Sequence, residues 1–511
     1  MKNLKKVMFL AVAFSSLIGL LFIAKPSFAD LKASNFEFGG YYRVRQIYYH
    51  NIATKNSENT SYFIQRFRLD PILNVNEDIS IHAQIDMLDN VLWGDNTQVD
   101  LGNSVYIGNP SNTSAYYYPS VTTPDGTALL NINLTRAWLE YHSPIGNFSI
   151  GRMPFGFGLG VNYNDGDGFK NEWGDAYYGN TADQIQFATM PMGKDGPLVT
   201  VLDYAKMKSG NINNPYDDED WYMFIPGYKT KNYTVFLLLL NIEQNLYKKN
   251  INYAELYADL KPTEHLKLLA DYFYMSGSLM PFTAGSTGAS ALQQQLGTST
   301  LTVKDAQGGV LRGIYTQNPL DYVLEIGFSP ANGTKPDYIE TYPFSNDYNS
   351  SLILFNNTGL AGPNSFPNPT ISTLSAVGGL NNPQTSIPPQ SVLKDDFTYF
   401  APMVKFVPAD FFNAKLQLMY AETNDFTNYS PAGLAWLATN RQGPPPAVKL
   451  ARDLGYEADL GVDFTLSQKF IFGFETGYLI PGHVFDYTNS AGQTKSADGV
   501  FAFETRFTVL L

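Results

Sequence analysis

The segment Gly499-Val-Phe-Ala-Phe-Glu-Thr-Arg-Phe-Thr-Val-Leu-Leu511 decides the fold class. Successive side chains of an extended chain point to opposite faces. One face therefore carries Phe501, Phe503, Thr505, Phe507, Val509 and Leu511, and the other carries Ala502, Glu504, Arg506, Thr508 and Leu510. Such a strand would be an exposed apolar edge in a soluble sheet, whereas the last strand of an outer-membrane barrel pairs with the first. We therefore expect a barrel that closes by pairing this strand with residues 36–49.

Alternating segments recur along the rest of the chain, with short and long connections in turn between them. We expect an antiparallel up-and-down β-barrel of eighteen strands, with sixteen as the alternative. The expected strands are 36–49, 62–75, 79–89, 130–142, 147–153, 182–191, 197–207, 220–228, 232–241, 251–260, 265–275, 319–329, 337–344, 396–407, 411–423, 453–466, 469–480 and 499–511. Residues 337–344 have the weakest pattern and are included because an even number returns the last strand to the periplasmic side.

The long connections are expected outside the cell and the short turns in the periplasm. The Ser-, Asn-, Gly- and Pro-rich tracts 276–318 and 345–395 are typical of loops, although a disordered linker is an alternative. Loop 90–129, with Trp93 and Tyr116 to Tyr118, could fold into the pore or remain on the outside.

The first 29 residues have the pattern of a cleaved secretory signal peptide. Lys2, Lys5 and Lys6 precede an apolar run, and Ser27-Phe28-Ala29 is a suitable cleavage site. A membrane anchor of about 18 residues is the alternative. Cleavage would leave one barrel domain, residues 30–511, and the loss of four lysines would change its formal net charge from −13 to −17. So acidic a chain is not expected to bind nucleic acid.

The arginines are unevenly placed. Arg43 and Arg45 fall in the first expected strand, Arg66 and Arg68 in the second, and Arg136, Arg152 and Arg506 in the fourth, fifth and last. Because an arginine facing lipid at the midplane costs about 2–4 kcal/mol, we expect these side chains to line the lumen, where His82 and Asp86 of the third strand also point. The wall could attract anions, or its charges could be paired structurally with Asp70, Asp86, Glu140 and Glu504. Both interpretations remain open.

No other pattern indicates a chemical site. The loop carboxylates Asp165, Asp167, Glu172 and Asp175 favour a solvated turn over a calcium site, because their spacing differs from the helix–loop–helix motif. The five histidines form no metal-binding spacing, and no Ser–His pair is indicated. The chain is therefore expected not to be an enzyme and to need neither metal nor cofactor.

Leu134-Thr-Arg136-Ala-Trp138-Leu-Glu140-Tyr141 and Ile150-Gly-Arg152-Met-Pro-Phe155-Gly-Phe-Gly158 resemble the alginate-export-type porins of Gram-negative bacteria, as does Arg66-Phe-Arg68-Leu-Asp70. The resemblance implies an eighteen-stranded monomeric channel whose basic lumen conducts an anionic polysaccharide. The arginines here are confined to one side, so we favour an outer-membrane porin for small hydrophilic solutes, with a preference for anions. A channel specific for an anionic sugar or polysaccharide and a plugged structural or adhesive barrel are the alternatives. Monomer and trimer both remain possible.

Overall fold

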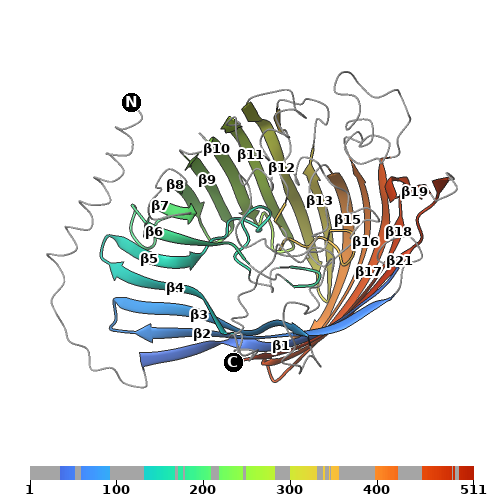
Figure 1. Ribbon diagram of the computed structural model, residues 1–511. Helices are drawn as coiled ribbons and strands as arrows, with labels where there is room; N and C mark the ends of the chain where they lie inside the picture. Colours follow the sequence, from blue (N-terminus) through green and yellow to red (C-terminus); the bar gives the residue numbers. More distant parts are fainter. Residues whose placement is uncertain are drawn as a thin grey trace, which may run out of the picture.

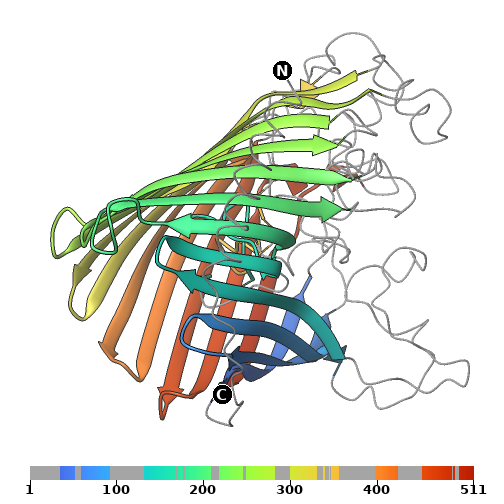
Figure 2. The same cartoon turned by 90° about the vertical axis from the view of Figure 1, so that its left-hand side faces the viewer.

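A single antiparallel sheet curls round until its two ends meet (Figures 1 and 2). The computed structural model describes residues 35–51, 59–92, 132–166, 171–175, 179–208, 218–244, 249–281, 300–330, 338–339, 344–345, 347–355, 397–423, 452–485, 487–488 and 494–511. β1 (Phe36–His50) pairs with β2 (Thr60–Asn74) on one side and with β21 (Val500–Leu510) on the other. The expected closure between the first and last strands is confirmed.

The ring consists of eighteen long strands, each paired with both neighbours. After β1 and β2 come β3 (Ile79–Leu92), β4 (Ile132–Ser143), β5 (Gly146–Pro154), β6 (Thr181–Thr189), β7 (Leu198–Lys208), β8 (Glu219–Lys229), β9 (Tyr233–Gln244), β10 (Lys249–Leu260), β11 (Leu266–Pro281), β12 (Thr300–Gln317), β13 (Leu320–Ser329), β15 (Phe397–Ala409), β16 (Phe412–Thr423), β17 (Asp453–Leu466), β18 (Phe470–Pro481) and β21. Short elements are β14 (Tyr338–Ile339), the 3-10 turn η5 (His483–Phe485), β19 (Tyr487–Thr488) and β20 (Thr494–Lys495). No helix within the described ranges is long and apolar enough to span a membrane.

Eighteen is the expected number, but one of the expected strands is wrong. Within this range the structure describes residues 338–339 and 344, and β14 pairs in parallel with Thr302 and Val303. It is not a member of the antiparallel ring, in which β13 pairs directly with β15. The missing strand is β12, within a tract expected to be a loop. Its Gly308 and Gly309 lie so close to Phe273 and to the backbone of Asp271 that larger residues would not fit. These glycines interrupt the alternation of apolar and polar residues, and for this reason β12 was not predicted from the sequence.

The ring has two different ends. Connections of two to eight residues, such as 75–78, 144–145 and 467–469, gather at one end, here named the turn end, where β1 begins and β21 finishes. The long connections, including 155–180 and 330–396, leave from the other end, the loop end, which also has one short connection, 245–248 between β9 and β10. The expected alternation of short turns and long loops is confirmed.

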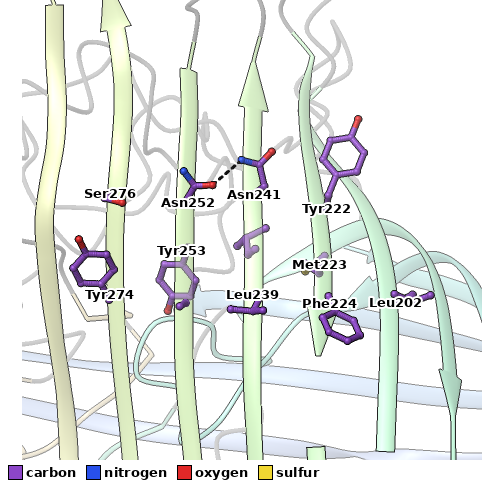
Figure 3. A pocket seen from close by; sticks show the side chains of 12 residues that line it. Leu202, Tyr222, Met223, Phe224, Leu239, Asn241, Asn252, Tyr253, Tyr274 and Ser276 are labelled. Carbon is purple, nitrogen blue, oxygen red and sulfur yellow. Dashed lines mark hydrogen bonds between the residues drawn. The ribbon is translucent and has the colours of Figure 1, made fainter. Parts of the chain in front are cut away.

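The outer face is apolar in the middle and polar towards the loop end. Two rows of outward side chains cross β7 to β11 (Figure 3). The apolar row is Leu202, Phe224, Leu239, Ala254 and Tyr274, and the amide row, two residues nearer the loop end on every strand, is Tyr204, Tyr222, Asn241, Asn252 and Ser276. Leu239 and Phe224 are each 41% exposed, so this surface needs an apolar surrounding.

Two pieces of the long connections fold into the barrel instead of staying outside. The first inner segment is residues 155–166 and 171–175, and the second is residues 344–345 and 347–355. Phe155, Val161 and Trp173 of the first, and Leu352 to Phe355 of the second, are at most 5% exposed and belong to one buried cluster with wall residues Leu238, Phe273, Phe397 and Tyr399. Burial of this apolar area stabilises the inward position. Loop 90–129, the sequence-based candidate for narrowing the pore, lies largely outside the described residues.

Candidate functional site

An arginine wall lines one side of the lumen. Its members are Arg43, Arg45, Arg66, Arg68, Arg136 and Arg506, from β1, β2, β4 and β21. Arg45 is 1% exposed and Arg66 is 3% exposed. Alternation places them inside because their neighbours Tyr42, Phe67 and Phe507 occupy the outer face, so the expected inward direction of these six arginines is met.

Two arginines of the wall form bidentate ion pairs with carboxylates of neighbouring strands. Arg68 donates to both oxygens of Asp86 at 2.6 and 2.8 Å, and Arg45 to both oxygens of Glu504 at the same distances. Such charge-assisted pairs are among the stronger hydrogen bonds of proteins. Asp70 and Glu140 have different partners, because they accept hydrogen bonds from Gln84 and Trp138. Part of the wall is therefore structurally paired.

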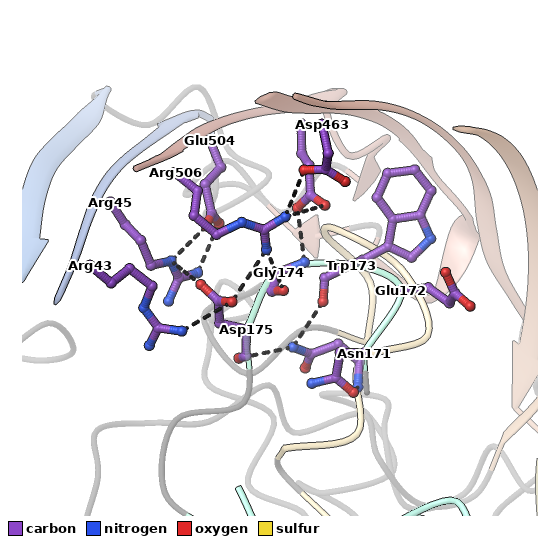
Figure 4. A network of polar contacts seen from close by, with 12 residues as sticks. Arg43, Arg45, Asn171, Glu172, Trp173, Gly174, Asp175, Asp463, Glu504 and Arg506 are labelled. Carbon is purple, nitrogen blue, oxygen red and sulfur yellow. Dashed lines mark hydrogen bonds and ion pairs between the residues drawn. The ribbon is translucent and has the colours of Figure 1, made fainter. Parts of the chain in front are cut away.

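Asp175, at the end of the first inner segment, is the point where three arginines of the wall meet (Figure 4). Its carboxylate lies 3.1 Å from Arg43, 3.1 Å from Arg45 and 3.2 Å from Arg506. Burial alone would raise the pKa of Asp175, but the charges of Arg43, Arg506 and Arg45 outweigh it and hold the pKa well below its usual range. The expectation of a solvated loop carboxylate is wrong for this residue, which is 4% exposed.

Residues next to Asp175 attach the first inner segment to two further strands, β15 and β16. Lys405 Nζ lies 2.6 Å from Glu172, and Lys415 Nζ lies 4.3 Å from the ring centroid of Trp173. Burial opposes ionisation of Glu172, yet Lys405, Arg312 and Lys415 lower its pKa to about 2. Gly174 N–H donates to Glu475 at 2.9 Å. Glu172 is therefore ionised, and its ion pair and the Gly174 hydrogen bond hold the first inner segment in place.

The second inner segment is held by backbone hydrogen bonds to two wall carboxylates. Ile353 and Leu354 N–H donate to Glu457 at 2.6 and 2.8 Å, and Leu352 N–H donates to Asp459 at 3.3 Å. Sequence reasoning missed these carboxylates together with Glu475, Lys405 and Lys415. Their inward phase on β15 to β18 and the apolar run Leu352 to Phe355 in a polar tract were the available signals.

Arg152 does not line the pore, contrary to expectation. It lies on the outer face with Ile150 and pairs there with Asp183 at 2.8 Å, both side chains being more than half exposed. The reason is that Met153, its neighbour, occupies the inner position. His82 does face the lumen, stacked on Trp138 with 4.8 Å between ring centroids and 3.7 Å from Glu140. It lies near the turn end, well apart from Asp175.

Closed pairing of all eighteen strands leaves no free edge, and the apolar outer face encloses a charged interior. Only a membrane provides the surroundings for such a ring, since each backbone polar group is satisfied within it. The chain is an outer-membrane β-barrel. Its porin-type architecture puts the turn end in the periplasm and the loop end outside the cell.

No family model matches the sequence, and no curated protein matches it either. Solved structures similar to this outer-membrane barrel include Pseudomonas aeruginosa OccK8 (OprE), with 10% identity, 95% of this chain and 99% of that chain covered, and a TM-score of 0.49. Acinetobacter baumannii OccAB3 has 9% identity, 93% and 100% coverage and a TM-score of 0.48. OmpT, an outer membrane protein of Vibrio cholerae, has 9% identity, 94% and 100% coverage and a TM-score of 0.35. The resemblance to alginate-export-type porins stays a prediction.

Within the described part of the barrel, no three His, Cys, Asp or Glu side chains are grouped so that they could hold a metal ion. Of the loop carboxylates considered for calcium, Glu172 pairs with Lys405 and Asp175 pairs with Arg43. Asp167 lies outside the described residues. The expectation that the chain is not an enzyme stays a prediction.

Proposed function

We propose that this outer-membrane barrel gives small hydrophilic solutes diffusive passage and that its arginine wall favours anions. The observation that carries the proposal is the meeting of Arg43, Arg45 and Arg506 at Asp175, where an inner segment reduces the free cross-section of the lumen. Guanidinium groups beside a constriction lower the energy of an anion and raise that of a cation.

Internal pairing limits the size of this preference. The carboxylates of Asp86, Asp175, Asp463, Glu475 and Glu504 lie 2.6–3.6 Å from arginines of the wall. Arg136, by contrast, donates to the hydroxyl of Thr181 and to the backbone carbonyls of Asp165 and Asn180. We therefore expect a moderate anion preference, and a channel specific for an anionic sugar or polysaccharide remains the finer alternative.

A plugged barrel is the second candidate function, because two inner segments pack on the apolar side of the lumen. Single-channel recording in a planar bilayer with a salt gradient distinguishes these candidates. The proposal expects ion conductance with a reversal potential on the anion-selective side, and Arg66→Gln should weaken the selectivity while Arg152→Gln, an arginine of the outer face, leaves it unchanged. Absence of conductance would favour the plugged barrel, and current blocked saturably by one sugar acid would favour the specific channel.

A further inference from the structure

Two carboxylates of the barrel wall face each other beneath the first inner segment. Glu255 of β10 and Asp271 of β11 are completely buried, with 0% of their area exposed. Their carboxyl groups lie close enough to share a hydrogen bond, yet Glu255 Oε1 and Asp271 Oδ1 have no hydrogen-bond donor. Two carboxylates held together away from water repel each other strongly, so a cation or a proton must lie between them.

The basic side chains of this part of the wall do not supply that cation. Each of them forms an ion pair with another carboxylate: Arg312 lies 2.5 Å from Glu325, Lys267 lies 3.2 Å from Asp259, and Lys249 lies 2.9 Å from Glu219. Within the described part of the barrel, Glu255 and Asp271 therefore have no basic partner.

An amide of the first inner segment contributes a third unpartnered oxygen. Asn162 is 6% exposed, and its Oδ1 has no hydrogen-bond partner. The Nδ2 of the same amide donates to Tyr253 Oη at 2.8 Å, and Tyr253 Oη donates to Glu255 Oε2 at 2.5 Å. The amide thus belongs to the same cluster as the carboxylates. β10, β11 and the inner segment each bring one unpartnered oxygen to it.

A proton shared by the two carboxyl groups would satisfy this cluster only in part. It would leave a net negative charge beside Phe273, which lies opposite Glu255 and is 0% exposed. It would also leave Asn162 Oδ1 without a partner. A divalent cation neutralises both carboxylates and accepts all three oxygens as ligands. Calcium fits this donor set better than magnesium, because it binds carboxylate and amide oxygens in flexible geometry, whereas magnesium usually keeps several waters.

We propose that Glu255, Asp271 and Asn162 bind a calcium ion that joins the first inner segment to β10 and β11. Leu159 N–H donates to Asp271 Oδ2 at 2.7 Å, which orients this carboxylate and leaves its Oδ1 for the ion. Calcium takes six to eight oxygens, so second carboxylate oxygens, carbonyl groups or water complete its shell. The site departs from the expectation of a metal-free chain, because two of its three side chains are acidic and the third is an amide. Removal of the ion releases this anchor of the segment, while Asp175 continues to hold the other end.

The test uses the full chain folded in detergent micelles, stripped of divalent cations with EGTA and titrated with calcium chloride at neutral pH in a calorimeter. We expect saturable calcium binding that magnesium at the same concentration does not replace. Glu255→Gln keeps the shape of the side chain and should weaken calcium binding at least about tenfold. Asn162→Ala keeps both carboxylates and should weaken it severalfold. The matched control is Glu422→Gln, which changes a carboxylate of the outer face and should bind calcium as the wild type does.

Absence of saturable calcium binding by the wild type would overturn the proposal and assign a shared proton to the carboxyl pair. Equal affinities of the wild type and Glu255→Gln would also overturn it, since the calcium would then bind elsewhere on the chain. If Glu255→Gln does not assemble, judged by heat-modifiable gel mobility, Asn162→Ala decides in its place. Limited proteolysis mapped by mass spectrometry gives an independent measurement: chelation should increase cleavage within residues 155–166, and unchanged cleavage would contradict the anchoring role of the ion.

Discussion

Arg45 and Glu504 lie 459 residues apart in the chain, yet their side chains form a bidentate ion pair at 2.6 and 2.8 Å inside the barrel. Arg45 belongs to β1 and Glu504 to β21, so this pair bridges the seam where the sheet closes. Both side chains are nearly inaccessible, with 1% and 4% of their area exposed. The first and last strands are therefore held together by this buried ion pair as well as by their backbone hydrogen bonds.

Removing one partner of this pair should destabilise the barrel. Glu504→Ala leaves Arg45 buried with less compensation, and breaking a buried pair in this way typically costs about 3–5 kcal/mol. Urea-induced unfolding in detergent micelles, followed by tryptophan fluorescence, measures the change. Asp183→Ala breaks the exposed pair with Arg152 and should cost no more than about 1 kcal/mol. Equal effects of the two variants would refute a stabilising role of the seam pair.

Neutralising Asp175 should increase anion selectivity. Asp175→Asn removes the carboxylate that faces Arg43, Arg45 and Arg506. A unit charge at about 4 Å is worth about 1 kcal/mol in bulk water and about 4 kcal/mol at an effective dielectric constant of 20. In a water-filled lumen the lower figure applies, so the anion-to-cation permeability ratio should rise about fivefold. Reversal potentials in a salt gradient provide the measurement. Asp183→Asn, on the outer face, serves as the control, and an unchanged ratio in Asp175→Asn would contradict the prediction.

Loosening the second inner segment should enlarge the conductance. Glu457 accepts hydrogen bonds from Ile353 and Leu354, and hydrogen bonds to a charged group contribute about 1.5–3 kcal/mol each. Glu457→Gln replaces one of the two acceptor oxygens by a donor, so we expect larger and noisier single-channel currents. Glu422→Gln changes a carboxylate on the outer face of the adjacent β16 and should leave the current as it is. Identical traces from both variants would count against a narrowing role of the segment.

Acid should leave the first inner segment in place over most of the pH range. A carboxyl whose pKa is depressed on folding stabilises the fold above its unfolded pKa, and this contribution disappears as the pH falls through the folded value. For Glu172 these values are about 4.3 in the unfolded chain and about 2 in the barrel, and the pKa of Asp175 shifts in the same direction. We therefore expect residues 171–175 to stay equally protected from proteolysis between pH 8 and about pH 5 and to lose protection only below about pH 3. Loss of this protection near neutrality would be incompatible with the ion pairs of Glu172 and Asp175.

Gly309 should tolerate no side chain. A Cβ there would collide with the carbonyl oxygen of Asp271, and overpacking of this kind costs typically about 1–3 kcal/mol. Gly309→Val should reduce the yield of heat-modifiable barrel. Gly313→Ala on the same strand is the control, because a Cβ there would meet only the side chain of Leu268, at 3.7 Å. Normal assembly of Gly309→Val would show that β11 and β12 can separate without loss.

Alternation predicted the strands well because each crossing must present one apolar face to lipid. Closure, the inward arginines of β1, β2 and β21, and the outward Phe36 and Phe38 follow from that requirement alone. β12 was not predicted because Gly308 and Gly309 allow neighbouring strands to approach closely and contribute no apolar side chain that would face lipid. Arg152 was placed wrongly because polar residues are also tolerated on the outer face near the loop end.

The inner segments could not be predicted from the sequence by periodicity. They have no regular structure of their own, and their position depends on charges from many strands, such as Asp175 with Arg43 and Arg506, or Glu172 with Lys405. One sequence signal does exist: the run Val235 to Leu240 in β9 is apolar on both faces, and an apolar inner face indicates packing against something inside the barrel. Its inward Leu238 and Leu240 indeed belong to the same buried cluster as Val161 of the first inner segment.

The first inner segment reaches from Leu159, whose N–H donates to Asp271 on β11, to Asp175 at β1 and β21. It acts as an internal cross-brace between distant parts of the cylinder and should resist flattening under lateral membrane pressure. Because its far anchor needs arginines from both the first and the last strand, the brace can lock only after the cylinder is complete. Protection of residues 171–175 from proteolysis would therefore report the final step of assembly.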